Sequence, residues 1–145
     1  MVTEFESGTP EETYEFVMKL GREARPGQVY TLNGDLGAGK TVFAKGFAKG
    51  LGIDDTVSSP TFTILQVYES GRYPLYHFDV YRIADSSEMD EIGFDEYVYS
   101  EGISLIEWAE YIEDILPDKY IRIDIQRDLE KGFDHRHIRV ESVGE

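Results

Sequence analysis

The segment from Gly34 to Thr41 has the residue types and the spacing that are needed to hold phosphate groups. It reads G-D-L-G-A-G-K-T and fits the pattern G-x-x-x-x-G-K-[ST] of a phosphate-binding loop. Glycines let successive backbone N–H groups point inward at phosphate oxygens. In such a loop Lys40 reaches the β- and γ-phosphates, and the hydroxyl of Thr41 ligates Mg²⁺. The pattern therefore predicts a site for a nucleoside triphosphate.

The residues on both sides of this loop predict the strand and the helix that such loops connect. Val29 to Leu32 form a short β-prone run, and Phe43, Phe47 and Leu51 recur at the spacing of one helix face. The dipole and the free amides of a helix N-terminus attract anions at the same place. A glycine-rich turn that fits the pattern by chance is the alternative, and the correct flanks make that coincidence rare.

Two carboxylates, Asp79 and Glu107, could complete the site, because each follows an apolar run. An enzyme with a phosphate loop needs an acidic residue at the end of a neighbouring strand to hold Mg²⁺ directly or through water. The run from Ile103 to Ile106 is apolar enough for a buried central strand, which favours Glu107 as the metal ligand. Asp79 could orient the attacking water or sense the γ-phosphate. For either residue alone, an ordinary carboxylate at a strand end is the alternative.

A polar segment after the predicted helix contains Ser59 and Thr61. Many NTPases have a switch segment here that contacts Mg²⁺ or the γ-phosphate. A proline-containing turn, with its hydroxyls bonded to local backbone amides, explains the pattern equally well. Trp108 is expected to be a packed aromatic residue. No histidine has a ligand-like spacing, so all three are interpreted as structural or surface residues, and no nucleophilic triad or zinc motif is present.

The charge of the chain argues against a direct, tight grip on nucleic acid. The 145 residues include 29 acidic and 14 basic ones, with a formal net charge of −15. Nucleic-acid binders usually carry a basic patch instead. A basic protein partner is compatible with this charge, although solubility alone is the more ordinary explanation.

The remaining composition predicts one folded domain over residues 1–145. Hydrophobic residues make up 41% of the chain and aromatic residues 13%, which is typical of a globular protein. No apolar run of about 18 residues predicts a membrane span. The N-terminus lacks the basic start and apolar core of a signal peptide. With no cysteine, disulfides and thiolate metal sites are excluded, and the cytoplasm is the expected location.

Helix and strand signals follow the chain in an alternating order. A first helix is expected to begin with Thr9 as N-cap, Pro10 at its first position and Glu12 closing a capping box, and to end at Pro26-Gly27. Segments 62–69 and 73–79 predict a β-hairpin that is an antiparallel insertion in the sheet.

The second half of the chain predicts short helices and further strands. Short helical pieces are expected in 84–97 around Gly93, and a short helix in 108–116. The predicted strands are 103–107, 121–125 and 136–141. The expected fold class is therefore α/β. It is a single-domain P-loop NTPase with a mostly parallel central sheet plus antiparallel additions, namely the β-hairpin and the C-terminal strands.

Four segments together resemble one known family. They are G-D-L-G-A-G-K-T at 34–41, S-P-T-F at 59–62, H-F-D-V-Y-R at 77–82 and L-I-E-W at 105–108, in this order and at compatible spacing. This set is similar to the TsaE (YjeE) family of small bacterial ATPases. The phosphate loop is shared by many families, but the other three segments make the resemblance specific. With the first helix start, it spans nearly the whole chain.

The resemblance implies a role in making the threonylcarbamoyl modification of the adenosine beside the anticodon in certain tRNAs. TsaE-like proteins act with TsaB and TsaD, and TsaD performs the transfer. ATP hydrolysis by the TsaE-like protein supports turnover of the complex, with low activity expected on its own. The tRNA is then contacted mainly through the partners, which agrees with the acidic charge.

The resemblance also implies roles for particular residues. Thr41 and Glu107 would coordinate Mg²⁺, while Lys40, Asp79 and Thr61 would be the catalytic residues around the γ-phosphate. The residues that it implies for nucleotide binding are Leu36, Gly37, Ala38, Gly39, Lys40, Thr41, Glu110 and Arg136. The implied cofactors are ATP and Mg²⁺, and the preference for ATP over GTP comes from the family alone.

Two other functions stay open at the level of the sequence. A small-molecule kinase would share the strand–loop–helix start, but such kinases usually close an Arg-bearing lid over the acceptor. Basic residues are sparse between Arg82 and Lys119, which counts against a lid there. The other alternative is a non-catalytic module in which ATP gates assembly by binding two states with different affinity.

Overall fold

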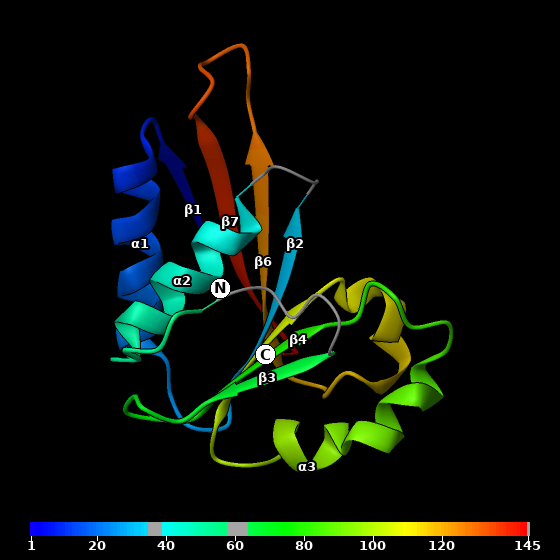
Figure 1. The fold of residues 1–145 in the computed structure, drawn as a ribbon. Helices are drawn as coiled ribbons and strands as arrows, with labels where there is room; N and C mark the ends of the chain where they lie inside the picture. Colours follow the sequence, from blue (N-terminus) through cyan, green and yellow to red (C-terminus); the bar gives the residue numbers. More distant parts are fainter. Residues whose placement is uncertain (35–38, 58–63, 145) are drawn as a thin grey trace.

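The computed structural model describes residues 1–34, 39–57 and 64–144, which alternate between strands and helices along the chain (Figure 1). The first half contains β1 (Val2–Ser7), α1 (Pro10–Glu23), β2 (Val29–Gly34), α2 (Lys40–Gly50), β3 (Leu65–Tyr68) and β4 (Leu75–Asp79). The second half contains the 3₁₀ segment η1 (Ser86–Ile92), α3 (Phe94–Val98), β5 (Ile103–Glu107), the 3₁₀ segment η2 (Ala109–Ile115), β6 (Tyr120–Arg127) and β7 (Arg136–Val143).

Within the described residues, seven strands form one sheet in the order β1-β7-β6-β2-β5-β4-β3. The neighbouring strands β6, β2, β5 and β4 are parallel to one another. The pairs β1–β7, β6–β7 and β3–β4 are antiparallel. This confirms an α/β fold with a parallel core and antiparallel additions.

Two details of the sheet differ from the sequence-based expectation. The hairpin β3–β4 forms, but β4 pairs in parallel with β5 and belongs to the core, so the expectation of an antiparallel insertion is wrong for β4. Strand β1 was not expected, because its polar sequence VTEFES gives a weak strand signal. Its backbone pairs with β7 along the sheet edge, where one strand face can be exposed to water.

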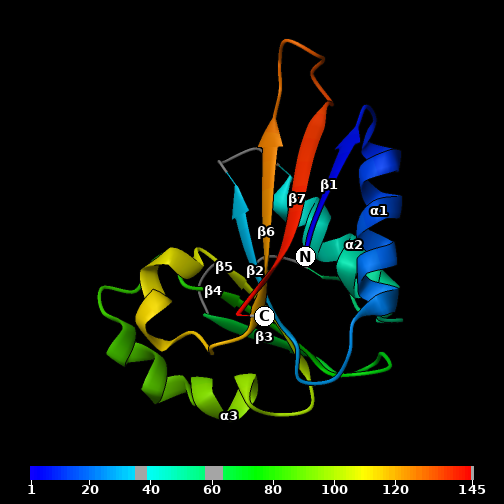
Figure 2. The ribbon, with the colours of Figure 1, turned by 180° about the vertical axis from the view of Figure 1, so that it is seen from behind.

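Helices cover the two faces of the sheet, with α1 and α2 on one face and η1, α3 and η2 near the other (Figures 1 and 2). Successive side chains of a strand point to opposite faces, so a strand contributes to both layers. In β5, Leu105 packs in the cluster with α1 and α2, and Ile106 packs with α3 and η2. The central strand β5 is buried throughout, as its apolar run predicted.

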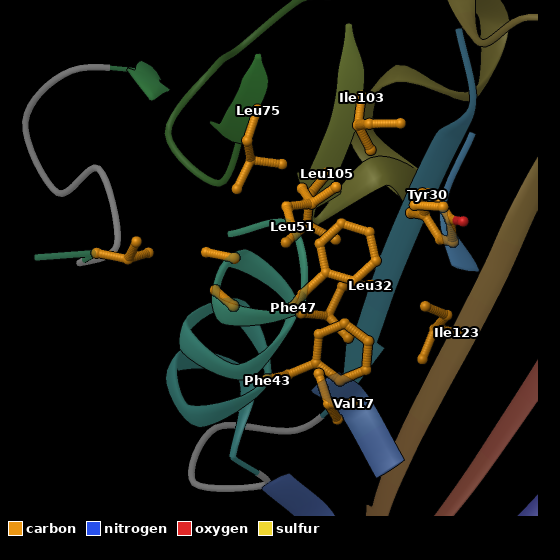
Figure 3. Packing of buried hydrophobic residues seen from close by; sticks show 14 of the residues in the cluster. Val17, Tyr30, Leu32, Phe43, Phe47, Leu51, Leu75, Ile103, Leu105 and Ile123 are labelled. Atoms are coloured by element: carbon orange, nitrogen blue, oxygen red, sulfur yellow. The ribbon is translucent and has the colours of Figure 1, made fainter. Parts of the chain in front are cut away.

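The core between α2 and the sheet is built from aromatic and aliphatic side chains. Phe43, Phe47 and Leu51 are fully buried, which confirms the predicted apolar helix face. Figure 3 shows the two phenylalanines pointing from α2 towards Leu32 of β2. The ring of Tyr30 meets Phe47 edge-on at 4.8 Å between centroids. This packing fixes α2, and with it the end of the phosphate-binding loop, against the parallel strands.

Helices α1 and α2 approach closely because glycines face each other at their C-terminal ends. A methyl group on Gly21 would overlap the carbonyl oxygen of Phe47, and one on Gly50 would overlap the carbonyl oxygen of Met18. Arg72, from the β3–β4 turn, donates to the carbonyl oxygens of Gly50 and Gly21 at 3.0 and 3.2 Å. It therefore adds donors at the last turn of each helix, where carbonyl groups lack the regular intrahelical partner. The carbonyl oxygen of Gly21 also accepts from the amide of Ala24 at 3.3 Å.

The start of α1 agrees with its capping signal except for one contact. The hydroxyl of Thr9 accepts from the amide of Glu12 at 3.1 Å, and Pro10 occupies the first turn. The Glu12 carboxylate accepts from the amide of Gly8 at 2.9 Å, one residue before the position that a capping box requires. The chain leaves β1 through Gly8, which brings that amide within reach.

Candidate functional site

Asp79 and Glu107 lie side by side at the carboxyl ends of adjacent parallel strands. Asp79 is paired with Glu107 in the register of β4 and β5, and Leu32 of β2 is paired with Glu107 on its other side. Ligands of open parallel sheets bind beyond the carboxyl ends of the strands. The structure thus brings together the two carboxylates that sequence reasoning selected, 28 residues apart in the chain by their numbers.

Both carboxylates are on the sheet face that α2 covers. Leu75 and Ile103 pack in the α1–α2 cluster, and the alternation of side chains places Asp79 and Glu107 on the same face. Helix α2 begins at Lys40 with the preceding Gly39 at φ 104°, a left-handed conformation that favours glycine. The amino end of α2 and the carboxyl ends of β4 and β5 therefore belong to one side of the sheet.

The surroundings of Asp79 disfavour its charged form. Burial raises the pKa of the Asp79 carboxyl above its ordinary value. The amide of Tyr81 donates to Oδ1 of Asp79 at 3.1 Å and opposes this rise. The negative charge of Glu107 raises the pKa further, and the positive charge of Lys40 lowers it. These opposing effects show that Asp79, Glu107 and Lys40 share one electrostatic environment.

His77 is the residue at this site that sequence reasoning did not single out. Its Nε2 lies 2.6 Å from Oε2 of Glu107, and both side chains are buried. An ionised carboxylate only accepts, so the Nε2–H of His77 donates. Its Nδ1 has no partner among the described residues, which agrees with a proton on Nε2. The alternation H-F-D within β4 places His77 and Asp79 on one face, and this spacing was the available signal.

Trp108 is more than a packed aromatic residue. It follows Glu107 directly and has φ 63°, the one positive φ of a non-glycine residue within the described residues. The Nζ of Lys40 lies 3.8 Å from the centroid of the Trp108 ring, a cation–π contact. The turn after β5 therefore brings an aromatic face to the lysine of the phosphate-binding loop.

Arg136 and Glu110 occupy different places around this site. Arg136, at the start of β7, lies close to the phosphate-binding loop, because a Cβ on Gly39 would be 3.8 Å from its Nε. Glu110 is exposed on η2. It lines a pocket of about 290 Å³ together with Thr31 and Asn33, whose side chains point to the sheet face opposite that of Leu32.

The remaining predicted positions, apart from Thr41, fall outside the described residues. Leu36, Gly37, Ala38 and Thr61 lie outside the described ranges, as does Ser59. Thr41 is an exposed residue in the first turn of α2.

The oxygen donors at this site suit a magnesium ion that is coordinated partly by the protein and partly by phosphate groups. Oxygen atoms from carboxylates and hydroxyls are the ligands that Mg²⁺ prefers, and it is usually held by one or two carboxylates plus phosphates. Among the described residues, no group of three or more His, Cys, Asp or Glu side chains forms a metal cluster. Glu107 and Thr41 would supply the smaller set, and one oxygen of Glu107 already accepts a hydrogen bond from His77.

A family model described as "Threonylcarbamoyl adenosine biosynthesis protein TsaE" matches residues 7–138. The chain belongs to the TsaE family. The matched range includes the residues of the phosphate-binding loop, both strand-end carboxylates and Arg136. Nucleotide binding is consistent with this family and fold.

Curated relatives and a solved structure agree with this membership. The chain is 51% identical to a tRNA threonylcarbamoyladenosine biosynthesis protein TsaE of Bacillus subtilis, over 93% of this chain and 82% of the relative. It is 43% identical to the protein of that name from Treponema pallidum, over 83% of this chain and 88% of the relative. The crystal structure of Bacillus subtilis YdiB is similar with a TM-score of 0.84 and 42% identity, covering 100% of this chain and 87% of that one.

Among the described residues, no helix combines the length and the apolar character that crossing a bilayer requires.

Proposed function

We propose that this protein is a Mg²⁺-dependent ATPase that acts in the cytoplasm with TsaB and TsaD. In this proposal it supports the threonylcarbamoylation of the adenosine adjacent to the anticodon in tRNA. The coarser part of the function follows from the family, whose members are threonylcarbamoyladenosine biosynthesis proteins. The hydrolysis of ATP and the two partners are the parts that experiments must test.

One observation carries the ATPase proposal. Asp79 and Glu107 are paired in register at the carboxyl ends of β4 and β5, on the sheet face where α2 begins with Lys40. A phosphate-binding loop needs a lysine for the phosphates and an acidic strand end for the metal. This pairing provides both at one side of the sheet.

Each residue has a distinct task in this proposal. Lys40 binds the β- and γ-phosphates, and Thr41 and Glu107 hold Mg²⁺. Asp79 orients the attacking water near the γ-phosphate. Thr61 acts with Asp79 near the γ-phosphate. The other residues assigned to nucleotide contacts are Leu36, Gly37, Ala38, Gly39, Glu110 and Arg136.

The bound Mg²⁺ would neutralise charge on the phosphates during hydrolysis. The chain's own residues then position the reactants. His77 fixes the carboxylate of Glu107 by its hydrogen bond of 2.6 Å, which limits the rotamers of that side chain. The raised pKa of Asp79 makes its carboxylate a better proton acceptor than an exposed aspartate.

Phosphate release from ATP tests the hydrolysis, measured with Mg²⁺ for the protein alone and with purified TsaB and TsaD. Lys40→Ala and Glu107→Gln should each reduce the release by at least about a hundredfold, because positioning and charge stabilisation supply most of this catalysis. Glu69→Gln, an exposed carboxylate in the β3–β4 turn at the opposite end of β4 from Asp79, is the matched control and should keep the wild-type rate.

Thermal stability with and without Mg²⁺ and ATP provides a readout that does not depend on turnover. A ligand that binds the folded state raises the midpoint of unfolding. Adding ATP and Mg²⁺ together should raise the unfolding midpoint of the wild type. In Glu107→Gln, the part of this rise that depends on Mg²⁺ should be absent. Wild-type hydrolysis in Glu107→Gln would remove this residue from the metal site. Fast hydrolysis that ignores TsaB and TsaD would contradict the role in their complex.

A further inference from the structure

The side chains of Tyr81, Trp108 and Tyr111 form a surface that we call the aromatic face. The ring centroids of Tyr81 and Trp108 are 4.8 Å apart, and Tyr111 lies 6.1 Å from Trp108 and 6.3 Å from Tyr81. Tyr81 is 55% exposed and Tyr111 is 48% exposed. Exposed aromatic residues are enriched at protein–protein interfaces relative to the rest of a surface. Here two exposed tyrosine rings contact the half-buried ring of Trp108, which also packs against the core.

The backbone at the centre of the aromatic face is strained. Trp108 adopts φ 63° and ψ 35°, the left-handed region that a bulky side chain rarely occupies. Such outliers persist only when the surroundings hold them, and they gather at functional sites. The strained turn holds the Trp108 ring between the core cluster that contains α3 and η2 residues and the ammonium group of Lys40.

The aromatic face already accepts a positive charge. The ammonium group of Lys40 lies 3.8 Å from the centroid of the Trp108 ring. This contact shows that a cation fits the ring geometrically and electrostatically. It also places the aromatic face directly beside the proposed nucleotide site, so a partner bound here would lie next to the phosphate-binding loop.

The charge around the aromatic face specifies the chemistry of its partner. Residues 83–118, which carry Trp108 and Tyr111, include no lysine, arginine or histidine, whereas Arg82 follows Tyr81 directly. Glu110, Glu113 and Asp114 are exposed on η2, the same element that carries Tyr111. A surface of this sign attracts cationic groups and repels the phosphates of nucleic acid.

We propose that the aromatic face, together with the carboxylates of Glu113 and Asp114 on η2, is the docking surface for a protein partner that presents arginine side chains among apolar ones. Arginine fits because its planar guanidinium stacks on aromatic rings and pairs with carboxylates. This inference rests on the proposed function, because the partner is the protein complex with which the ATPase acts. Docking there would couple the partner to the nucleotide site through Trp108.

The test measures binding of the purified TsaB–TsaD complex to the wild type and to Tyr81→Ser/Tyr111→Ser by calorimetry. The double variant should bind at least about tenfold more weakly, since a few aromatic side chains often supply most of the binding energy of an interface and truncating them removes it. Glu113→Lys should also weaken binding, and more strongly at low salt. Phe133→Ser is the matched control, because Phe133 is 74% exposed at the distant β6–β7 turn and should change binding less than twofold.

The thermal shift produced by ATP and Mg²⁺ shows that each variant is folded, because neither tyrosine is assigned to the nucleotide. Wild-type affinity of the tyrosine variant for the complex would overturn the inference and leave the proposed function standing. A wild type that fails to bind the complex would overturn the proposed function and the inference with it. Binding of tRNA to the isolated protein that disappears in the tyrosine variant would also overturn it, since the surface would then read nucleic acid.

Discussion

The imidazole of His77 donates a hydrogen bond of 2.6 Å to the carboxylate of Glu107 in the interior of the protein. The two residues come from adjacent parallel strands, β4 and β5, and are 30 positions apart in the chain. A buried carboxylate needs such a partner, because an unpaired charge in the interior costs several kcal/mol. The bond therefore stabilises the fold and also fixes the side chain that we propose as a metal ligand.

The first prediction concerns this pair. His77→Leu should lower the free energy of unfolding by about 1–3 kcal/mol, because it leaves the Glu107 carboxylate buried without its donor. The double variant His77→Leu/Glu107→Leu should recover part of that loss, since both polar groups are then absent. Urea denaturation of the single and double variants gives the coupling energy. If the changes in the free energy of unfolding of the two single variants add up to that of the double variant, the hydrogen bond makes no contribution to stability.

The second prediction is a pH dependence at Asp79. Its pKa is raised in the folded protein, so the native state takes up the proton at a higher pH than the unfolded chain does. The contribution of Asp79 to the free energy of unfolding therefore falls as the pH rises from 3.8, the ordinary pKa of the carboxyl, through its raised pKa in the folded protein. Asp79→Asn should raise the thermal midpoint at pH 7 by a few degrees at most, and this gain should shrink as the pH approaches 4.

The measurement for Asp79→Asn is a series of thermal unfolding curves from pH 7 to pH 4, without nucleotide or Mg²⁺. Glu91→Gln, an exposed carboxylate of η1, provides the comparison and should show no such trend. A gain for Asp79→Asn that stays constant over the whole series would exclude burial of the charge as its cause.

The third prediction concerns the close approach of α1 and α2. Gly21→Ala should destabilise the protein by about 1–3 kcal/mol, because its methyl group would overlap the carbonyl oxygen of Phe47 and push the helices apart. Gly8→Ala should stay within about 0.5 kcal/mol, since the nearest atom to its methyl group, Oε1 of Glu12, would be 3.4 Å away. Chemical denaturation of both variants checks the difference. Equal stability would mean that the helices can separate without cost.

The fourth prediction tests the role of Arg72 at the ends of these helices. Its guanidinium donates to the carbonyl oxygens of Gly50, Gly21 and Arg22 at 3.0, 3.2 and 3.0 Å. Arg72→Ala should cost about 1.5–3 kcal/mol, as expected for hydrogen bonds to a charged group. Arg72→Lys should restore less than half of this, because a single ammonium cannot reproduce the planar fork. A thermal melt that ranks lysine equal to arginine would refute this geometry.

The sequence alone determined the phosphate-binding loop, the flanking strand and helix, and the two strand-end carboxylates. These features depend on local residue types and short periods, which a single sequence shows directly. The period of Phe43, Phe47 and Leu51 predicted the buried face of α2, and the apolar run before Glu107 predicted a central strand. The family resemblance followed from the same local motifs.

The tertiary structure decided what depends on contacts between distant segments. The pairing of β4 with β5 in parallel, and not as part of an insertion, is set by the order in which strands join the sheet. The polar strand β1 forms because β7 supplies its backbone partners. Neither choice leaves a periodic signal in the sequence. The side chains of β4 alternate in the same way whether its partner is parallel or antiparallel, and β1 lies at the sheet edge, where a strand need not be buried on both faces.

The same reason explains the two residues whose surroundings were unexpected. His77 was interpreted as structural or surface, and Trp108 as a packed aromatic residue. The register of β4 against β5 brings His77 to Glu107, and the left-handed turn at Trp108 brings its ring to Lys40. A sequence specifies which side chains are available. The distance between two of them is set by strand register and backbone turns, which depend on the packing of the whole chain.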